Sequence, residues 1–383
     1  MKILNLIKQR GYAATLLTLM AGTFFWSQQS FAFSCKLMPN LGVMNFTMPL
    51  QGGNITVGPD VSNGTIIYRQ YFKPSRETQI SCENNTISYQ PTISWYYSNN
   101  PNPVSNWSDG TFSAGKVYET GIPGVGIAIY TYDKPARYTV PFDYQAWQKE
   151  YSTSGTLWRA QGGFEFDVVL IKTGTISPGT LSGAQLPTVK YDFKAQSITP
   201  INLGSLSFSG ALNIVSQTCQ TPDVIVPMGS YDVGRYFTGT GKTTEWKDAT
   251  IKLINCPRFY GTLNDGRNTW TSNNGNSALG TFTNNVLNLV LSPNTSIIDS
   301  ANGILGLKTG SDSATGIGIQ MAYGTTSDTS PPLVDFSNSK NYVMQSDSAT
   351  TQSMPLIARY IQTESGVTAG KADATVTFTI SYY

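Results

Sequence analysis

The protein has 383 residues, of which 13% are charged and 40% hydrophobic, and it contains no histidine. Its 25 Lys and Arg residues nearly balance 23 Asp and Glu residues, which argues against nucleic acid or an anionic membrane as a partner. The missing histidine excludes Ser-His-Asp and Cys-His catalysis and histidine metal sites, and we expect no cofactor and no metal.

Residues 1–32 are predicted to be a secretory signal peptide. Three basic residues precede an apolar run at 13–26, and the segment ends on the small residue Ala32. A membrane anchor is the alternative, but the run is shorter than the roughly 20 apolar residues that a spanning helix needs. We therefore expect an exported chain that begins at Phe33, with 22 Lys and Arg against 23 Asp and Glu.

The four cysteines fall into an N-terminal pair, Cys35 and Cys82, and a C-terminal pair, Cys219 and Cys256. Neither pair has the close spacing of a metal knuckle or a redox Cys-x-x-Cys motif. In an exported protein we expect one structural disulfide within each pair, although the sequence alone allows three connectivities. Each disulfide would stabilise the fold by roughly 3 to 4 kcal/mol.

The first region predicts short strands separated by Gly, Pro and Asn turns. Alternating apolar residues place these strands at 87–97, 125–132 and 164–172. Segment 195–205 has no periodicity and contains Pro200 and Gly204. We therefore predict a linker at 201–205, which separates a first domain, 33–200, from a second, 206–383.

The second region repeats the strand pattern. Its predicted strands lie at 224–228, 249–255, 286–291, 316–323, 354–361 and 372–383. With the strand that leads into Cys219, these make about seven segments, the number in an immunoglobulin-like sandwich. We expect an all-β protein of two β-sandwich domains.

The second region also contains ordered motifs. Cys219 follows an opening strand, and the segments VIVPMG, IKLINC, GIGIQM and PLIARY precede a final alternating strand that ends at Tyr383. With this series, residues 206–383 resemble a pilin domain of chaperone-usher fimbriae. The segments VYETGIPGVGIAI (117–129) and FEFDVVLIKTGTISPGTLSGA (164–184) resemble the N-terminal receptor-binding, lectin-like domains of fimbrial tip adhesins. The likeness is greater to the adhesins of type 3 fimbriae than to those of type 1.

The resemblance implies that the second domain is an incomplete immunoglobulin-like sandwich. Such a domain leaves an apolar groove beside its last strand. A periplasmic chaperone lends a strand to this groove, an outer-membrane usher exports the subunit, and an adjacent pilin subunit replaces the lent strand. The side chains that would line the groove are Val376, Phe378, Ile380 and Tyr382. The alternative is an ordinary edge strand.

The first domain directly precedes the pilin-like domain in the sequence, and this order predicts where the subunit lies in the fimbria. A shaft subunit carries a free alternating extension just before its pilin domain, which it donates to its neighbour. Here that position is occupied by a domain that contains Cys35. A subunit that accepts a strand but donates none is terminal, so we expect this protein at the tip of a fimbria on the cell surface.

Aromatic and polar loop residues of the first domain are candidates for binding a host or surface glycan or glycoprotein. A sugar needs flat apolar faces beside groups that bond its hydroxyls. The candidates are Trp107, Asp109, Tyr130, Tyr132, Trp147, Trp158 and Arg159. The aromatic members have a second interpretation as core residues. A non-adhesive tip-initiating subunit is the alternative function.

An enzymatic function has one candidate pair of carboxylates. Glu165 and Asp167 lie on one face of a predicted strand, as the acids of a glycosidase would. The simpler interpretation is the solvated face of a strand whose other face is apolar, and we favour it. We expect a binding protein and not an enzyme.

Overall fold

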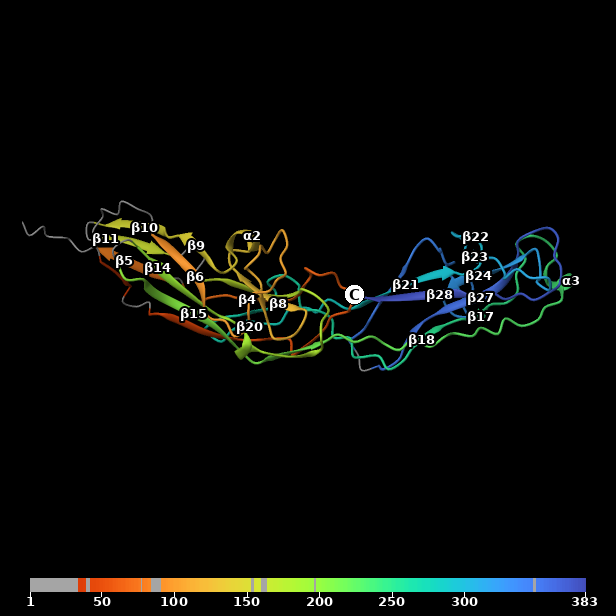
Figure 1. Ribbon diagram of the computed structural model, residues 1–383, viewed down its shortest axis with the longest axis horizontal. Coiled ribbons are helices and arrows are strands. Elements are labelled where there is room, and N and C mark those ends of the chain that lie inside the picture. Colours follow the sequence, from red (N-terminus) through yellow and green to blue (C-terminus); the bar gives the residue numbers. More distant parts are fainter. Residues whose placement is uncertain are drawn as a thin grey trace, which may run out of the picture.

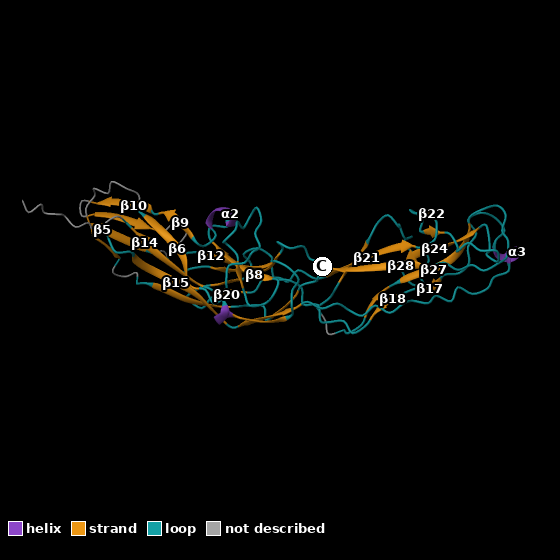
Figure 2. Cartoon of the chain, in the orientation of Figure 1, coloured by secondary structure: helices purple, strands orange, loops and turns teal. Residues whose placement is uncertain are grey.

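The computed structural model describes residues 34–38, 42–76, 78–83, 91–152, 155–159, 164–195, 198–346 and 349–383, without the side chains of 147–152 and 155–159. The predicted signal peptide, 1–32, lies outside these residues. Two lobes follow one another along the long axis of the molecule (Figure 1). Nearly all of their regular structure is strand (Figure 2), which confirms the all-β prediction.

The N-terminal lobe contains four sheets. The first has the order β1 (Ser34–Leu37), β5 (Gln79–Glu83), β11 (Gly155–Arg159) and β10 (Trp147–Ser152). The second has the order β2 (Met44–Pro49), β15 (Ile201–Ser209), β14 (Thr188–Lys194), β6 (Thr92–Asn99) and β9 (Phe142–Gln145). The third has the order β20 (Ser277–Ala278), β19 (Trp270–Thr271), β4 (Ile66–Phe72), β12 (Phe166–Lys172), β8 (Val125–Tyr130) and β7 (Tyr118–Glu119). The fourth has the order β13 (Gly179–Ser182), β16 (Ala211–Val215) and β3 (Asn54–Thr56).

The C-terminal lobe contains three sheets. One has the order β17 (Lys247–Asp248), β27 (Leu356–Gln362), β24 (Ile317–Tyr323), β23 (Ile304–Leu305) and β22 (Ile297–Asp299). Another joins β18 (Ile251–Leu253) to β26 (Gln352–Met354), and the third has the order β25 (Lys340–Val343), β21 (Val286–Pro293) and β28 (Val376–Tyr382). The described helices are the single turns α2 (Pro135–Tyr138) and α3 (Val233–Tyr236) and the 3₁₀ turn η1 (Gly183–Gln185).

Both predicted disulfides are present. Cys35 lies opposite Cys82 in the antiparallel pair of β1 and β5, and the two are bonded. Cys219 and Cys256 form the second bond, so each lobe contains one disulfide, as predicted. Among the described residues there is no free cysteine.

The third sheet of the N-terminal lobe lies at its centre and is buried on both faces. Every residue of β8 and β12 is buried, as expected for strands whose sequences are almost continuously apolar. One face packs in the main core around Trp95, whose ring contacts those of Phe164, Phe166 and Tyr191. A small second cluster, which includes Tyr130, covers the other face.

The boundary between the lobes differs from the predicted one. The expected linker, 201–205, lies inside β15, which pairs parallel with β2 and antiparallel with β14. The next strand, β16, pairs with β3 and β13, so it also belongs to the N-terminal lobe. Gly204 has a φ of 156° at a register shift in this ladder, so the residue that interrupts the pattern in the sequence marks an irregular strand rather than a linker.

A second segment, 257–285, returns from the C-terminal lobe to the N-terminal one. Its strand β19 pairs parallel with β4, and Leu263 is fully buried in the main core of the N-terminal lobe. The N–H of Thr56 donates to the carbonyl of Gly261. The N-terminal lobe therefore consists of residues 34–215 and 257–285, and the C-terminal lobe of 219–256 and 286–383.

An ion cluster joins this returning segment to the N-terminal lobe. Asp167, on β12, has no exposed side-chain surface, and its two oxygens accept hydrogen bonds of 2.7 Å from the guanidinium groups of Arg69 and Arg267. Arg267 also reaches Glu165 at 3.4 Å. The expectation of a solvated pair is wrong for Asp167, because the outer face of β12 is covered. Both of its carboxylate oxygens accept hydrogen bonds from arginines, which gives the buried charge a partner on each side.

The boundary generates a testable prediction. Fragment 33–200 lacks β15, and so loses the buried side chains of Leu203, Leu206 and Phe208, leaves β2 without a partner strand and leaves β14 paired on one side only, with β6. Losing one such side chain costs about 2 to 5 kcal/mol, so we expect no cooperative thermal transition by circular dichroism.

A matched control is a fusion of residues 33–215 to 257–285 through a Gly/Ser linker, which keeps every strand of the lobe. It should melt cooperatively. If fragment 33–200 melted as sharply as the fusion, the boundary described above would be contradicted.

Candidate functional site

The edge of the last strand is the most distinctive surface of the C-terminal lobe. Among the described strands, β28 has one neighbour, β21, with Leu287 opposite Tyr382 and Pro293 opposite Val376. Val286 and Tyr383 exchange both backbone hydrogen bonds, of 2.9 and 2.8 Å. In an antiparallel ladder such pairs alternate, so the odd-numbered residues of β28 bond to β21 and the even-numbered ones point their N–H and C=O groups away.

Three of those even-numbered residues have no backbone partner on that side. In the described part of the chain, no hydrogen bond is formed by the outward N–H or C=O groups of Val376, Phe378 and Ile380. Their side chains are half-buried, whereas Thr377 and Thr379 between them are exposed. The free edge and the apolar face therefore belong to the same residues.

A groove lies along this edge. It encloses about 650 Å³ between β28, the segment 223–229 and the inner faces of β21, β24 and β27. Its apolar lining residues are Val224, Val226, Met228, Ala249, Ile251, Leu291, Leu305, Ile319, Met321, Leu356, Ala358, Ala372, Ala374, Val376 and Phe378. Most of these residues also belong to the core of the C-terminal lobe. The groove is thus an opening into that core.

The wall opposite β28 was predicted as a strand at 224–228, and the structure shows no strand there. Residues 223–229 make no backbone hydrogen bond within the described chain. Val224, Val226 and Met228 still face the groove, while Ile225 between them is 90% exposed. The alternation in the sequence is real, but no neighbouring strand lies alongside to form a ladder.

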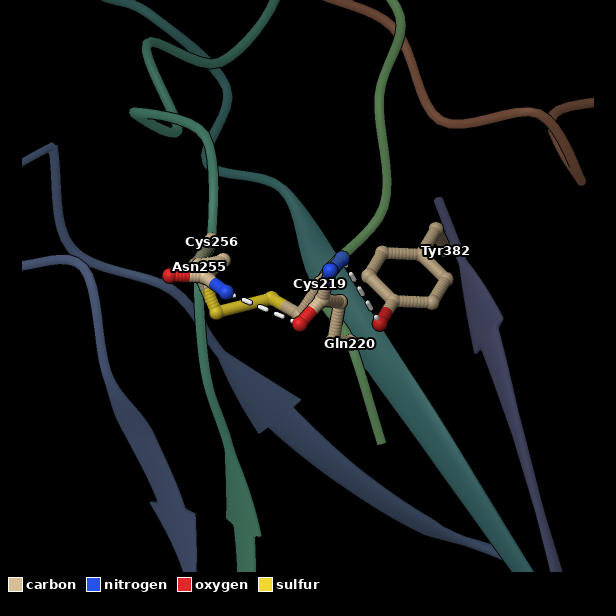
Figure 3. The surroundings of a disulfide bond; sticks show 5 residues. All are labelled: Cys219, Gln220, Asn255, Cys256 and Tyr382. Atoms are coloured by element: carbon tan, nitrogen blue, oxygen red, sulfur yellow. Dashed lines mark hydrogen bonds between the residues drawn. A yellow bond between two sulfur atoms is a disulfide. The ribbon is translucent and has the colours of Figure 1, made fainter. Parts of the chain in front are cut away.

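The groove continues into a smaller cavity beside the second disulfide. This cavity, of about 250 Å³, is lined by Asp60, Thr218, Cys219, Thr221, Phe378, Ile380 and Tyr382. Figure 3 shows the ring of Tyr382 next to the disulfide of Cys219 and Cys256, with the N–H of Cys219 donating to the phenol oxygen at 3.2 Å. Asn255 holds the other side of the bridge, because its amide donates to Gln220 at 2.8 Å.

Tyr382 is the last of the predicted groove-lining residues of β28 and the most buried of them. Its side chain is only 5% exposed, and burial raises the pKa of its phenol, which stays neutral at physiological pH. All four residues predicted from the sequence, Val376, Phe378, Ile380 and Tyr382, line one of the two cavities. Asp60, which comes from the other lobe, was not predicted to lie here. The wall at 223–229 was predicted as an ordinary strand at 224–228.

The predicted ligand-binding residues are not gathered in one site. Tyr130 is 2% exposed and lies in the second cluster of the N-terminal lobe, so placing it on a binding surface was wrong. Trp107 packs half-buried against the same cluster. Asp109 is exposed, but its carboxylate accepts the N–H groups of Thr111 and Phe112, which shapes a turn. The alternation of 125–132 could not reveal that the loop before it covers its outer face.

The remaining candidates lie elsewhere on the lobe. Trp147 and Arg159 are paired in the hairpin of β10 and β11, and Trp158 pairs with Gln148, but the side chains of these candidates lie outside the described residues. This hairpin lies at the outer end of the N-terminal lobe (Figure 1).

Tyr132 has a different setting, in a cluster of three half-buried or buried tyrosines. Its ring centroid lies 5.4 Å from that of Tyr138 and 5.5 Å from that of Tyr144. Burial raises the pKa of Tyr132, so its hydroxyl is a neutral hydrogen-bond donor. Tyr138 and Tyr144 were missed because they flank a turn and show no strand pattern in the sequence.

No group of three or more His, Cys, Asp or Glu side chains among the described residues is placed to hold a metal ion. Within the same residues, no helix has the length and apolar character needed to cross a membrane.

Residues 206–383 match the model of a family described as fimbrial protein. The match covers the same region as the resemblance found in the sequence. The matched region begins within β15, so it includes the end of β15 and all of β16, β19 and β20, which pair in the N-terminal lobe. No curated protein matches the chain.

Solved structures with some similarity include proteins of pili. The CupB6 tip adhesin of Pseudomonas aeruginosa aligns at 15% identity over 91% of this chain and 94% of its own, with a TM-score of 0.34. The receptor-binding domain of the adhesin MrkD1P of Klebsiella pneumoniae aligns at 20% identity over 49% of this chain and 98% of its own, with a TM-score of 0.31. The P pilus rod subunit PapA aligns at 15% identity over 44% of this chain and 100% of its own, with a TM-score of 0.29. These TM-scores are too low to carry an argument about function.

The bond between Tyr382 and Cys219 generates a prediction for the groove end. Tyr382→Phe leaves the buried N–H of Cys219 without its partner, so we expect the full chain to lose about 1 kcal/mol of stability. Tyr383→Phe is the matched control, because Tyr383 is 47% exposed and should change stability by less than about 0.5 kcal/mol. Urea unfolding measures both, and equal losses would show that the bond adds nothing.

Proposed function

We propose that the protein is a fimbrial tip adhesin whose C-terminal lobe is completed by a β-strand from another protein. The observation that carries this proposal is the free edge of β28, where Val376, Phe378 and Ile380 present unpaired backbone groups over an apolar groove. The family of residues 206–383 supports it, since a fimbrial protein is a subunit of a polymer and must bind other subunits.

An extended segment fits this groove better than a helix or a small molecule does. Outward backbone groups recur at every second residue of β28, about 7 Å apart, which is the spacing of an added strand. The backbone of 223–229 on the other wall is also unpaired, so an inserted strand can bond on both sides. Alternate apolar side chains of the incoming segment would then fill the space above Leu291, Ile319 and Met321.

The incoming segment belongs to a second protein at each stage of assembly. A periplasmic chaperone occupies the groove first, an outer-membrane usher exports the subunit, and an adjacent pilin subunit provides the final strand. The protein then lies outside the cell as part of a pilus. Its role is binding and not catalysis, and the two arginines that occupy Asp167 agree with this.

The position at the tip rests on the two strands at the start of the matched region, β15 and β16. Residues 201–215, where a shaft subunit would carry its free donor segment, form β15 and β16 and are paired with β2, β3, β13 and β14. A segment held in two ladders is not available for donation. The subunit accepts a strand without offering one from this position.

The N-terminal lobe would bind the ligand, a glycan or a glycoprotein of a host or other surface. The tyrosine cluster of Tyr132, Tyr138 and Tyr144 is the site that the geometry favours, since it brings aromatic rings and phenol hydroxyls together. Arg69 and Asp133, joined at 2.7 Å beside Tyr132, add charged hydrogen-bonding groups.

The alternative is a non-adhesive tip-initiating subunit. It is favoured by the structural roles of two predicted ligand residues, since Tyr130 is buried and Asp109 shapes a turn. A screen of glycans and matrix proteins against the full chain separates the two functions.

The groove generates a prediction for two neighbouring residues of one strand. Phe378→Asp places a charge in the apolar groove, and we expect it to abolish periplasmic recovery with a fimbrial chaperone and to weaken a bound alternating Thr/Val peptide at least tenfold. Thr379→Asp changes the exposed face of the same strand and should leave both nearly unchanged. If both variants behaved alike, the groove would not be the binding site.

The tyrosine cluster generates a prediction for the ligand. Tyr132→Ala removes one aromatic face, and we expect adhesion to the bound glycan or glycoprotein to fall at least fivefold in a binding assay. Tyr236→Ala, on α3 in the other lobe, is the control and should have no effect on adhesion. Ligand binding that survives Tyr132→Ala would move the site elsewhere on the lobe.

A further inference from the structure

Tyr382 differs from the three even-numbered residues before it, because its outward backbone groups are already paired. Its N–H donates to Oδ2 of Asp60 at 2.7 Å, and its carbonyl accepts the N–H of Asp60 at 3.3 Å. Asp60 belongs to the N-terminal lobe, in the turn 58–61 that follows β3. One residue of the other lobe thus occupies the edge position that a strand partner would use.

The turn also leaves no room beside Tyr382. Gly58 is buried, and a Cβ at this position would overlap the carbonyl of Tyr382. Glycine is required here by this close approach. The smaller cavity, which begins at Phe378, has Asp60 among its lining residues, so the open path along β28 ends at the turn.

An alternating strand needs such a boundary to fix its register. Val376, Phe378, Ile380 and Tyr382 are all apolar and face one way, so an incoming strand that slips by two residues still presents its apolar face to the groove. The pattern of side chains alone therefore distinguishes poorly between registers.

We propose that the turn 58–61 is an end stop for strand addition. The incoming segment pairs with Val376, Phe378 and Ile380 and ends before Tyr382, so the N-terminal lobe sets its register and the length of its paired part. The partner is an extended segment of another chain, alternately apolar over that stretch. This inference rests on the proposed function, since it requires that the groove accept a strand.

The test uses the exported full chain and two synthetic peptides. The short peptide alternates Thr and Val over seven residues, and the long one adds one Val and one Thr at each end, so that it reaches Tyr382 in either direction. The double variant Gly58→Ala/Asp60→Ala displaces the turn and removes its acceptor. Gly42→Ala is the control, because a Cβ at Gly42 meets nothing within 4 Å.

We expect the ratio of long-peptide to short-peptide affinity to rise about fivefold in the double variant relative to the wild type. This is the effect of one added backbone hydrogen bond, and comparing ratios cancels any gain at the other end of β28. The Gly42→Ala ratio should equal that of the wild type. An unchanged ratio in a folded double variant would overturn the end stop.

Amide hydrogen exchange on the wild type provides a second readout that needs no variant. The amide of Tyr382 should be protected before any peptide is added, and the long peptide should add protection only at Val376, Phe378 and Ile380. New protection at Tyr382 together with these three would refute the end stop alone. No protection at any of the three would refute the proposed function and the end stop with it.

Discussion

The unpaired backbone of β28 is the constraint on which the C-terminal lobe depends. A buried N–H or C=O group without a partner costs about 1 to 3 kcal/mol, and three successive outward positions here have none in the described chain. The buried residues Leu287, Leu289 and Leu291 of β21 lie opposite this strand, and no described strand lies beyond it. Much of the lobe's core therefore borders the groove. Under the proposed function, one extended segment satisfies pairing and burial together, so that completion of the fold and binding are the same event.

The end of that strand is tied to the N-terminal lobe by more than Asp60. Asn285 is 4% exposed, and its amide donates to the carbonyls of Thr56 and Tyr383. Its oxygen accepts the N–H of Gly261. The bond from Asn285 to Tyr383 crosses between the lobes, whereas the other bonds and the buried pair of Asp167 and Arg267 hold the segment 257–285 in the N-terminal lobe. The orientation of the N-terminal lobe is therefore fixed with respect to the groove.

The sequence predicted the structural elements that depend on local residue patterns. The alternation of 372–383, 316–323 and 354–361 predicted β28, β24 and β27, and the spacing of the cysteines predicted both disulfides. The prediction of an exposed Tyr130 and of a strand at 224–228 was wrong, because each depends on a neighbour distant in sequence. The loop around Phe112 that covers Tyr130 leaves no periodic signal in the sequence. The groove beside Val226, where a neighbouring strand would lie, leaves none either.

The same limit applies to the lobe boundary. A linker was expected where Pro200 and Gly204 interrupt the pattern, yet the chain continues there as β15. Nothing local in the segment 257–285 shows that Leu263 fills the core of the other lobe. Residues that a sequence separates widely can be placed together only when the pairing of whole strands is known.

The return of 257–285 to the first lobe has a consequence for the order of folding. Chains usually fold domain by domain from the N-terminus as they emerge. Here the N-terminal core lacks Leu263 until more than half of the chain has been synthesised, and Thr56 lacks its partner Asn285, 229 positions further on, until later still. Such long loop closures are slow, so the N-terminal lobe stays partly open, and prone to aggregation, until the segment 257–285 has joined it.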